Sequence, residues 1–368
     1  MIPVCSPTIG RLEKEYVQSC LDTGWISSSG DFIMKFEDEW ANYCGCKYGV
    51  TTTNGTHALE LAIAALQLPK GSEVILPSFT IISCAIAIIK NNLKPVFVDA
   101  RPDTWCMDVS NLESYITSQT SAIMPVHIYG YPVDMNVILD IANKYKLRII
   151  EDAAEAHGAE CFVRNIKSWK KCGSVGDVGC FSFYANKIIT TGEGGMVITN
   201  DRDLADSMKS IRNLCFGNNN NRFLHTGIGS NYRMTNIQAS IGLAQLSRID
   251  EILGKKEFIK RYYNANINNN DFQLPPISSS DFNCVNWMYG LVSRNPHKTA
   301  SYFIENLRRY GVDSRPFFVG LHRQPSLISN RPYPICDWLS EYGFYIPSGV
   351  GLTTSEMDIV ISALRDLA

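Results

Sequence analysis

The sequence predicts an α/β fold: a mainly parallel sheet of seven strands with helices on both faces, followed by a smaller C-terminal α+β domain. The first observation behind this is that short apolar runs alternate with helical patterns through the first half of the chain. The second is the length of 368 residues, more than one hydrophobic core usually supports. We therefore expect a large domain over residues 1–245 and a small domain over residues 246–368.

Seven short apolar runs are the candidate strands, and four amphipathic patterns lie between them. The strands are Tyr48–Thr52, Val74–Leu76, Pro95–Val98, Ala122–Val126, Arg148–Glu151, Cys180–Phe183 and Met196–Thr199. The helices are His57–Leu68, Ile81–Lys90, Met135–Tyr145 and Asp203–Leu214. Right-handed crossovers would join these strands into one sheet.

The later part of the chain has a different pattern. A long helical pattern covers Ile237–Leu253 and continues with charges through Lys255–Ala265, and shorter ones cover Thr299–Tyr310 and Ser355–Leu367. The polar, proline-containing stretch Asn266–Asp281 predicts a linker or exposed loop. The run Asn218–Asn221 predicts a mobile surface loop.

Composition narrows the class of protein. With 45% apolar and 19% charged residues the chain is typical of a packed soluble protein, and a formal charge of −2 gives no reason to expect nucleic acid or an anionic membrane as partner. The apolar run 81–89 is too short to cross a bilayer, and residues 1–10 do not have the pattern of a secretory signal. We expect a cytoplasmic protein.

Twelve cysteines raise the question of a metal or disulfide framework. No C-x-x-C pair occurs, and Cys44 and Cys46 are one residue apart. Several others lie inside apolar stretches, where a free thiol behaves as a small hydrophobe. The spacing therefore predicts reduced, buried thiols and no metal site.

A lysine follows one of the buried strands. Lys187 lies just beyond the strand Cys180–Phe183 and precedes the motif Gly192-Glu193-Gly194-Gly195, whose glycines permit a tight backbone approach. Ligands of open α/β sheets bind at this edge, and a lysine desolvated there can lose its proton, as Schiff-base chemistry requires. The alternatives are an ordinary turn and a solvated lysine.

Two further groups belong to the same edge. Asp152 closes the strand Arg148–Glu151, and a buried carboxylate needs a partner such as the protonated pyridine nitrogen of a cofactor. Asn54-Gly55-Thr56 lies between a strand and a helix, where backbone N–H groups favour phosphate, and Ser182 could add a hydroxyl. The alternatives are helix caps by Asp152 and by Asn54 or Thr56. Together the groups predict one cofactor site.

These residues belong to a longer series of motifs. It contains Gly24-Trp25-Ile26-Ser27-Ser28-Ser29-Gly30, Phe36-Glu37, Asn54-Gly55-Thr56, Pro77-Ser78-Phe79-Thr80, Glu151-Asp152-Ala153-Ala154-Glu155-Ala156-His157-Gly158, Phe181-Ser182-Phe183-Tyr184-Ala185-Asn186-Lys187, Gly192-Glu193-Gly194-Gly195 and Asn231-Tyr232-Arg233-Met234. In this order they resemble the DegT/DnrJ/EryC1/StrS sugar aminotransferases, which share the aspartate-aminotransferase (type I) fold. The likeness covers nearly the whole chain.

The resemblance implies a pyridoxal 5′-phosphate enzyme that works as a homodimer with active sites at the subunit interface. Lys187 would form the Schiff base and Asp152 would pair with the pyridine nitrogen. The phosphate would be held by a group of donors: Gly55, Thr56, Ser182 and, from the partner subunit, the residue equivalent to Asn231. Glu155 would lie near the cofactor's phenolic oxygen with His157 close by; the alternatives are a helix carboxylate and a core histidine.

Two positions bear on the reaction. Many relatives carry an aromatic residue at Ile81, which here can cover the cofactor ring only by apolar contact. Dehydratases of the family replace the Schiff-base lysine by histidine, so Lys187 favours amino transfer over dehydration. A 3-aminotransferase is a further alternative.

The finer resemblance concerns the substrate. The sequence around Lys187 resembles that of family members that act on GDP-, dTDP- or UDP-linked 4-keto-6-deoxyhexoses. Those enzymes form amino sugars of the perosamine or viosamine type, with L-glutamate as amino donor. Arg315 and His322 are the candidates for contacting the substrate. A structural ion pair is the alternative for Arg315.

Overall fold

The computed structural model describes residues 1–217, 221, 223–327, 329 and 331–368. Most of the run Asn218–Asn221, predicted to be a mobile loop, therefore lies outside the described residues. A seven-stranded sheet has the order β1-β9-β8-β5-β4-β2-β3. Its strands are β1 (Tyr48–Thr52), β2 (Glu73–Pro77), β3 (Lys94–Val98), β4 (Thr120–Ile123), β5 (Arg148–Asp152), β8 (Val178–Ser182) and β9 (Gly195–Thr199). Only β9 runs antiparallel to its neighbours in this sheet, which confirms the predicted mainly parallel α/β fold.

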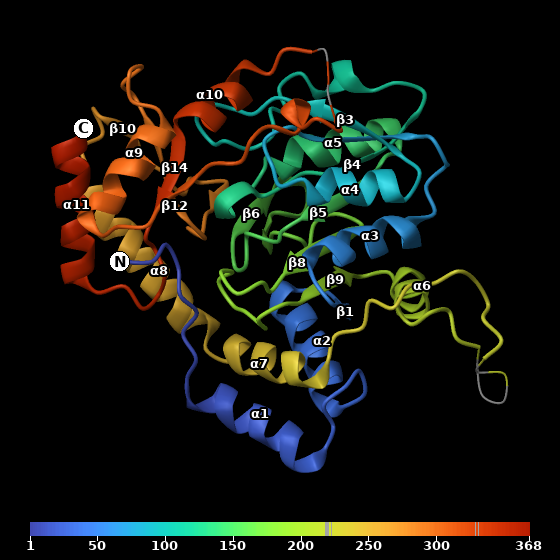
Figure 1. Ribbon diagram of the computed structural model, residues 1–368. Helices are drawn as coiled ribbons and strands as arrows, with labels where there is room; N and C mark the ends of the chain where they lie inside the picture. Colours follow the sequence, from blue (N-terminus) through green and yellow to red (C-terminus); the bar gives the residue numbers. More distant parts are fainter. Residues whose placement is uncertain (218–220, 222, 328, 330) are drawn as a thin grey trace.

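Helices cover both faces of this sheet. One layer contains α1 (Arg11–Thr23), α2 (Asp31–Cys44) and α7 (Asn236–Leu246), and the other contains α3 (Gly55–Leu66), α4 (Ser83–Lys90) and α6 (Arg202–Arg212). Both α2 and α3 contact β1 and β9, but α2 packs with α7 whereas α3 packs with α4 and α6. Figure 1 shows α1 alongside α7 at the bottom of the view, below the sheet. Helix α5 (Met135–Tyr145) packs on β4 and β5.

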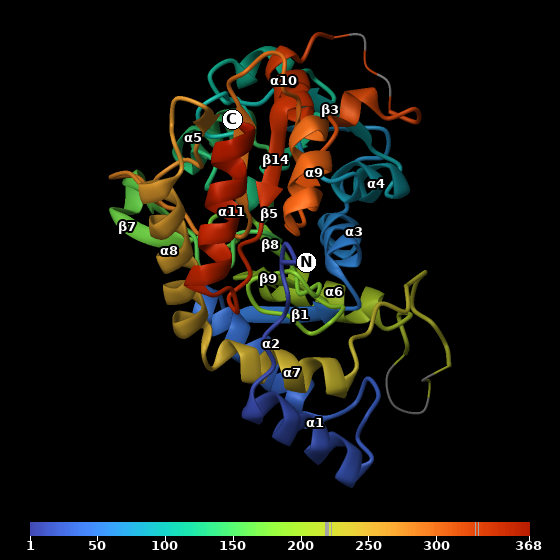
Figure 2. The same cartoon turned by 60° about the vertical axis from the view of Figure 1, so that its left-hand side comes forward.

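The C-terminal part builds a second, antiparallel sheet of order β10-β12-β14-β13. Its strands are β10 (Phe272–Gln273), β12 (Tyr289–Ser293), β13 (Arg315–Pro316) and β14 (Gly343–Ile346), and its helices are α8 (Ile249–Asn266), α9 (Ala300–Leu307), α10 (Pro334–Tyr342) and α11 (Thr354–Leu367). Figure 2 brings α8 and α11 forward, beside this sheet. A three-stranded sheet of β11 (Phe282–Asn283), β6 (Glu160–Val163) and β7 (Ser168–Lys171) joins segments far apart in sequence. Short 3-10 turns complete the described elements: η1 (Leu112–Tyr115), η2 (Ile128–Gly130), η3 (Arg164–Ile166), η5 (Arg308–Tyr310) and η6 (Leu321–Arg323).

Buried side chains form two hydrophobic clusters. The larger surrounds the seven-stranded sheet, and the smaller lies between the C-terminal sheet and helices α8, α9 and α11. Some C-terminal residues, among them Trp287 and Phe317, belong to the larger cluster. The division into residues 1–245 and 246–368 stays a prediction, which would place the boundary at the end of α7.

Two local predictions are wrong. The pattern from Ile237 to Ala265 is two helices, α7 and α8, because the chain turns at Ser247 and Arg248, and the Arg248 guanidinium is held by Glu13 and the Thr8 carbonyl. The stretch Asn266–Asp281 is not entirely loop, since β10 lies within it and pairs with β12.

Most of the cysteines are buried, as the sequence predicts. All twelve are free thiols, and all but Cys5 and Cys46 are buried. Within the described residues, no group of three or more His, Cys, Asp and Glu side chains is arranged to hold a metal ion. Likewise, across the described part of the chain, no helix is both long enough and apolar enough to span a membrane.

Candidate active site

The ends of β5 and β8 meet the beginning of α3 at one edge of the main sheet. A cavity of about 330 Å³ opens there. It is lined by Asn54, Gly55, Thr56, Leu59, Thr80, Ile81, Ser83, Val126, Asp152, Ala154, Glu155, Ser182, Tyr184, Asn186, Lys187, Glu193, Trp287, Phe318 and Tyr345. Apolar walls with a few convergent polar groups are the usual composition of a cofactor site.

One wall is the N-terminus of α3. Asn54 caps the helix by accepting the His57 N–H at 2.9 Å, as one alternative reading of the sequence predicted. Within the described residues the N–H groups of Gly55 and Thr56 have no acceptor, so two first-turn donors remain for a ligand. A Cβ on residue 55 would lie 2.7 Å from the Ser182 Cβ, and glycine is therefore required for this close approach. The Thr56 hydroxyl donates to Ser83 Oγ at 2.8 Å, and Ser182 completes a cluster of hydroxyls at this wall.

Asp152, the last residue of β5, is buried with 3% of its surface exposed. Its Oδ1 accepts the Ala154 N–H at 3.0 Å, and its Oδ2 accepts the Cys84 thiol at 3.0 Å. Burial and the neighbouring Asp152 raise the pKa of the Cys84 thiol well above its usual range, so the thiol stays protonated and acts as a donor. No helix follows Asp152, which excludes the alternative that it is a helix cap.

Lys187 lies within the segment that follows β8, and its side chain is 10% exposed. Its Nζ is 3.5 Å from Glu155 Oε1 and 3.6 Å from the centre of the Trp287 ring. Burial lowers the pKa of Lys187, against the opposite pull of Glu155 and Asp152. Burial also raises the pKa of Glu155, whose Oε2 accepts the Tyr129 N–H at 2.8 Å. A desolvated amine of this kind is suited to attack a carbonyl group.

The motif Gly192–Gly195 places the chain for this arrangement. Gly192 has a φ of +81°, which non-glycine residues rarely adopt, and a Cβ on Gly195 would overlap the Asn54 carbonyl. The tight backbone approach that these glycines permit is found at Gly195.

Three aromatic residues of the C-terminal part form the remaining wall, and sequence reasoning missed them. Trp287 precedes β12, Phe318 follows β13, and Tyr345 lies on β14. Burial raises the pKa of Tyr345 to about 12, so its hydroxyl remains a neutral donor near neutral pH. The three come from separate segments without a shared motif, and no local sequence signal groups them.

The structure sorts the predicted site residues into two groups. The cavity brings together Gly55, Thr56, Ile81, Asp152, Glu155, Ser182 and Lys187, and its lining does not include His157, Asn231, Arg315 or His322. Ile81 is 42% exposed at the mouth of the cavity.

His157 lies behind the cavity with 1% of its surface exposed. Its ring packs against Trp40 at 5.1 Å and Phe183 at 5.4 Å between centres. Burial, and then the nearby Lys187 charge, lower the pKa of His157 to about 3. This placement fits the core-histidine alternative and argues against contact with a substrate.

The buried histidine predicts a pH dependence of stability. The pKa of His157 is about 3 in the folded chain and about 6.5 when unfolded, so the unfolded state binds one more proton as the pH falls below 6.5. Relative to a His157→Phe variant, the native protein should lose about 1.4 kcal/mol per pH unit between pH 6 and pH 4. Urea unfolding at several pH values measures this difference, and parallel stability curves for the two proteins would contradict it.

His322 and Arg315 are engaged by other side chains. His322 pairs its Nδ1 with Ser78 Oγ at 2.7 Å and its Nε2 with Asp337 Oδ1 at 3.1 Å, which ties the segment after β2 to α10. Arg315 forms an ion pair of 3.0 Å with Asp313, the structural alternative that the sequence left open. It is half exposed, and its backbone pairs with the cavity residue Tyr345.

Asn231 is exposed and forms an isolated bridge with Asn213. Its predicted role, contact with a phosphate in the partner subunit, requires a second copy of the chain and stays a prediction.

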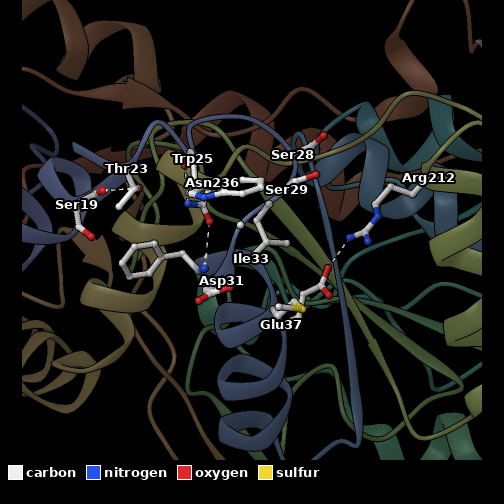
Figure 3. A pocket seen from close by; sticks show the side chains of 13 residues that line it. Ser19, Thr23, Trp25, Ser28, Ser29, Asp31, Ile33, Glu37, Arg212 and Asn236 are labelled. Carbon is white, nitrogen blue, oxygen red and sulfur yellow. Dashed lines mark hydrogen bonds and ion pairs between the residues drawn. The ribbon is translucent and has the colours of Figure 1, made fainter. Parts of the chain in front are cut away.

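A second hollow, of about 580 Å³, lies where α1, α2 and α7 meet (Figure 3). The Asn236 amide accepts the Phe32 N–H at 3.1 Å and donates to the Trp25 carbonyl at 2.7 Å, while Arg212 pairs with Glu37. These polar groups bond mainly to one another, although the buried Arg212 Nε has no partner among the described residues, and no lysine lines the hollow. An amine beside buried carboxylates is found in the smaller cavity, where Lys187 lies near Glu155 and Asp152, and this cavity is the candidate active site.

Comparison with known proteins gives a consistent result. Residues 7–365 match the model of the DegT/DnrJ/EryC1/StrS aminotransferase family. A GDP-perosamine synthase of Caulobacter vibrioides is 42% identical over 99% of this chain and 97% of its own length. A GDP-perosamine synthase of Escherichia coli O157:H7 is 39% identical over 99% of this chain and 98% of its own length.

Solved structures with a similar fold include aminotransferases. The crystal structure of the aminotransferase TlmJ from Streptoalloteichus hindustanus superposes with a TM-score of 0.91 at 26% identity, covering 100% of this chain and 98% of that one.

Proposed function

Because the chain belongs to the DegT/DnrJ/EryC1/StrS aminotransferase family and is thus a pyridoxal-phosphate-dependent sugar aminotransferase, we propose that it aminates the C4 ketone of a GDP-linked 4-keto-6-deoxyhexose. The product would be a 4-amino-4,6-dideoxyhexose of the perosamine type, and L-glutamate the amino donor. The observation that carries this choice is the 42% identity to a GDP-perosamine synthase over nearly the whole of both chains.

The residues of the cavity fit the cofactor. The free N–H groups of Gly55 and Thr56 at the start of α3, with the Ser182 hydroxyl, suit a phosphate, because a helix N-terminus favours an anion. Asp152 supplies a buried negative charge for the pyridine nitrogen, and Lys187 supplies the primary amine. When bound, pyridoxal phosphate supplies a conjugated aldehyde that withdraws electrons from the carbon next to the transferred nitrogen.

Lys187 has two tasks in this proposal. Its Nζ would hold the cofactor covalently, and as a free amine it would take a proton from the donor's α-carbon as general base and return it as general acid. Burial lowers the pKa of this amine and so increases the fraction that is unprotonated near neutral pH. Glu155 Oε1 lies 3.5 Å from Lys187 Nζ and pairs with the amine when the amine is protonated.

Asp152 and the aromatic wall have supporting tasks. The Asp152 carboxylate, oriented by the Cys84 thiol and the Ala154 N–H, would hold the ring nitrogen of the bound cofactor and favour its protonated form. Trp287, Phe318 and Tyr345 narrow the cavity from the side of the C-terminal sheet and limit the water that reaches Lys187.

A substrate panel tests the choice of sugar nucleotide. The purified enzyme is given L-glutamate and, in separate reactions, the GDP-, dTDP- and UDP-linked 4-keto-6-deoxyhexoses. We expect kcat/KM to be at least tenfold higher for the GDP-linked mannose-type ketone, with a product identified as a 4-amino sugar. Preference for a dTDP- or UDP-linked ketone would favour the viosamine-type alternative, and a 3-amino or dehydrated product would overturn 4-amination.

The proposal includes a homodimer with shared active sites. Mixing inactive Lys187→Ala and Asn231→Ala subunits should restore part of the activity, because a heterodimer would contain one complete site. No recovery despite subunit exchange verified by mass spectrometry would exclude a shared site. The cytoplasmic location stays a prediction.

A further inference from the structure

Lys187 meets a tryptophan that the sequence motifs do not include. The Trp287 indole N–H donates to the Asn186 carbonyl at 2.7 Å, and the ring face lies 3.6 Å from Lys187 Nζ. One side chain therefore holds both the backbone just before the lysine and the amine at its tip. Trp287 lies about a hundred residues away in sequence, between β11 and β12.

The Trp287 backbone is held by two hydrogen bonds, and its ring packs on Tyr129. Lys256 of α8 is buried and donates to the carbonyls of Trp287 and Ser348, both at 2.7 Å. The backbone N–H of Trp287 donates to the Tyr129 carbonyl at 3.3 Å, and the two rings stack with centres 6.0 Å apart. Trp287 is 5% exposed. The bonds with Lys256 and Tyr129 fix the Trp287 backbone, and the ring cannot turn away from Lys187 without breaking its own buried hydrogen bond to Asn186.

This geometry has a direct physical consequence for the lysine. A lysine side chain has four rotatable bonds, and holding its amine at one place costs conformational entropy. A cation over an aromatic face is attracted to it, and the attraction is stronger when water is excluded. The Glu155 carboxylate, 3.5 Å from the same Nζ, acts on the amine as well.

We propose that Trp287 is a positioning residue for Lys187: it holds the free amine at the cavity, ready to attach the cofactor and to carry the proton. The inference rests on the proposed function to the extent that Lys187 is the attaching amine. It adds a residue that acts through Lys187 and makes no claim about which sugar is aminated.

The first test follows attachment of the cofactor to the cofactor-free protein, without any turnover. Condensation of the Lys187 amine with the aldehyde forms a C=N bond and releases one water, and the absorbance of bound pyridoxal phosphate reports it. In Trp287→Leu we expect the first-order attachment step to slow about tenfold, while the preceding concentration-dependent binding step is unchanged. Trp287→Phe keeps a ring face without the indole N–H and should slow about threefold. Trp169→Leu, on β7 away from the cavity, is the matched control and should behave as the native protein.

The second test asks whether Trp287 acts through Lys187. In the single half-reaction with L-glutamate, Trp287→Leu should lower the limiting rate about tenfold and leave the glutamate concentration for half-maximal rate unchanged. In the Lys187→Ala background, with methylamine supplied as the proton carrier, the same substitution should have less than a twofold effect. If Trp287 had only a structural role, Trp287→Leu would lower the rate by the same factor with Lys187 present and in the Lys187→Ala background.

The proposal is overturned if the attachment step keeps its native rate in Trp287→Leu, or if the tenfold loss persists in the Lys187→Ala background. Circular dichroism and unfolding temperature verify folding, and Trp287→Phe serves if the leucine variant does not fold. Neither assay contains a sugar nucleotide. A failure to aminate any keto-sugar would thus refute the proposed function and leave this inference standing.

Discussion

Replacing Lys187 by alanine is expected to lower kcat for amino transfer at least about 10³-fold. The substitution removes both the amine that attaches the cofactor and the group that moves the proton, and general acid–base catalysis alone contributes about 10²–10⁴-fold. Burial lowers the pKa of Lys187, and no other amine lines the cavity among the described residues to take over its role. The measurement is the rate of the L-glutamate half-reaction, followed through the cofactor spectrum, and of full turnover with the keto-sugar nucleotide.

The controls separate charge from chemistry. Lys187→Arg keeps the positive charge beside Glu155 but cannot attach the cofactor, so it should be as inactive as the alanine variant. Lys70→Ala removes an exposed lysine after α3 and should leave kcat unchanged. Methylamine should restore part of the half-reaction in Lys187→Ala but not in Lys187→Arg, whose side chain fills the space. Native turnover in either variant would contradict the role of Lys187.

Replacing Asp152 by asparagine is expected to lower kcat about 10²–10³-fold, the effect usually found when one preorganised electrostatic partner is removed. Asparagine keeps the size of the side chain and can still accept the Ala154 N–H. It removes the negative charge that stabilises a protonated pyridine nitrogen, so the cofactor becomes a poorer electron acceptor. The rates of the two half-reactions and the dissociation constant of the cofactor are measured. We expect lower rates and a higher dissociation constant.

A matched control is available on the same domain. Asp201 caps α6 by accepting the Asp203 and Leu204 N–H groups, and asparagine is an equally good cap. Asp201→Asn should therefore leave kcat and cofactor affinity at native values. An Asp152→Asn enzyme with native kcat would show that the buried charge has no part in the reaction.

The half of the site that lies at strand ends could be predicted from the sequence. Asp152 and Ser182 close apolar runs, and Lys187 follows one of them. Since parallel strands end at the same edge, their side chains had to meet there. Gly55 and Thr56 carried the signature of a helix start, and the structure places both at the cavity wall.

The other half could not be predicted because it depends on tertiary packing. Trp287, Phe318 and Tyr345 reach the cavity only after the C-terminal sheet packs against the main one, and no spacing in the sequence links them to Lys187. Cys84 lies in α4 and contacts Asp152 from a segment 68 residues away in sequence. His157 is the opposite case. Its sequence motif predicts a place in the site, but its ring packs against Trp40 and Phe183 behind the cavity wall.

One helix boundary was also not predicted from the sequence. Apolar periodicity predicted one helix from Ile237 onward, since both α7 and α8 have buried faces in that pattern. At the junction of the two helices Arg248 forms an ion pair with Glu13, a long-range contact that periodicity does not reveal.

The most direct measurement is to treat the holoprotein with borohydride, digest it and identify the modified peptide by mass spectrometry. We expect a stable pyridoxyl group on Nζ of Lys187 in the native protein and none on that peptide after prior incubation with L-glutamate, which displaces the lysine. An unmodified Lys187, or a cofactor reduced onto a different lysine, would contradict the assignment of this cavity as the active site.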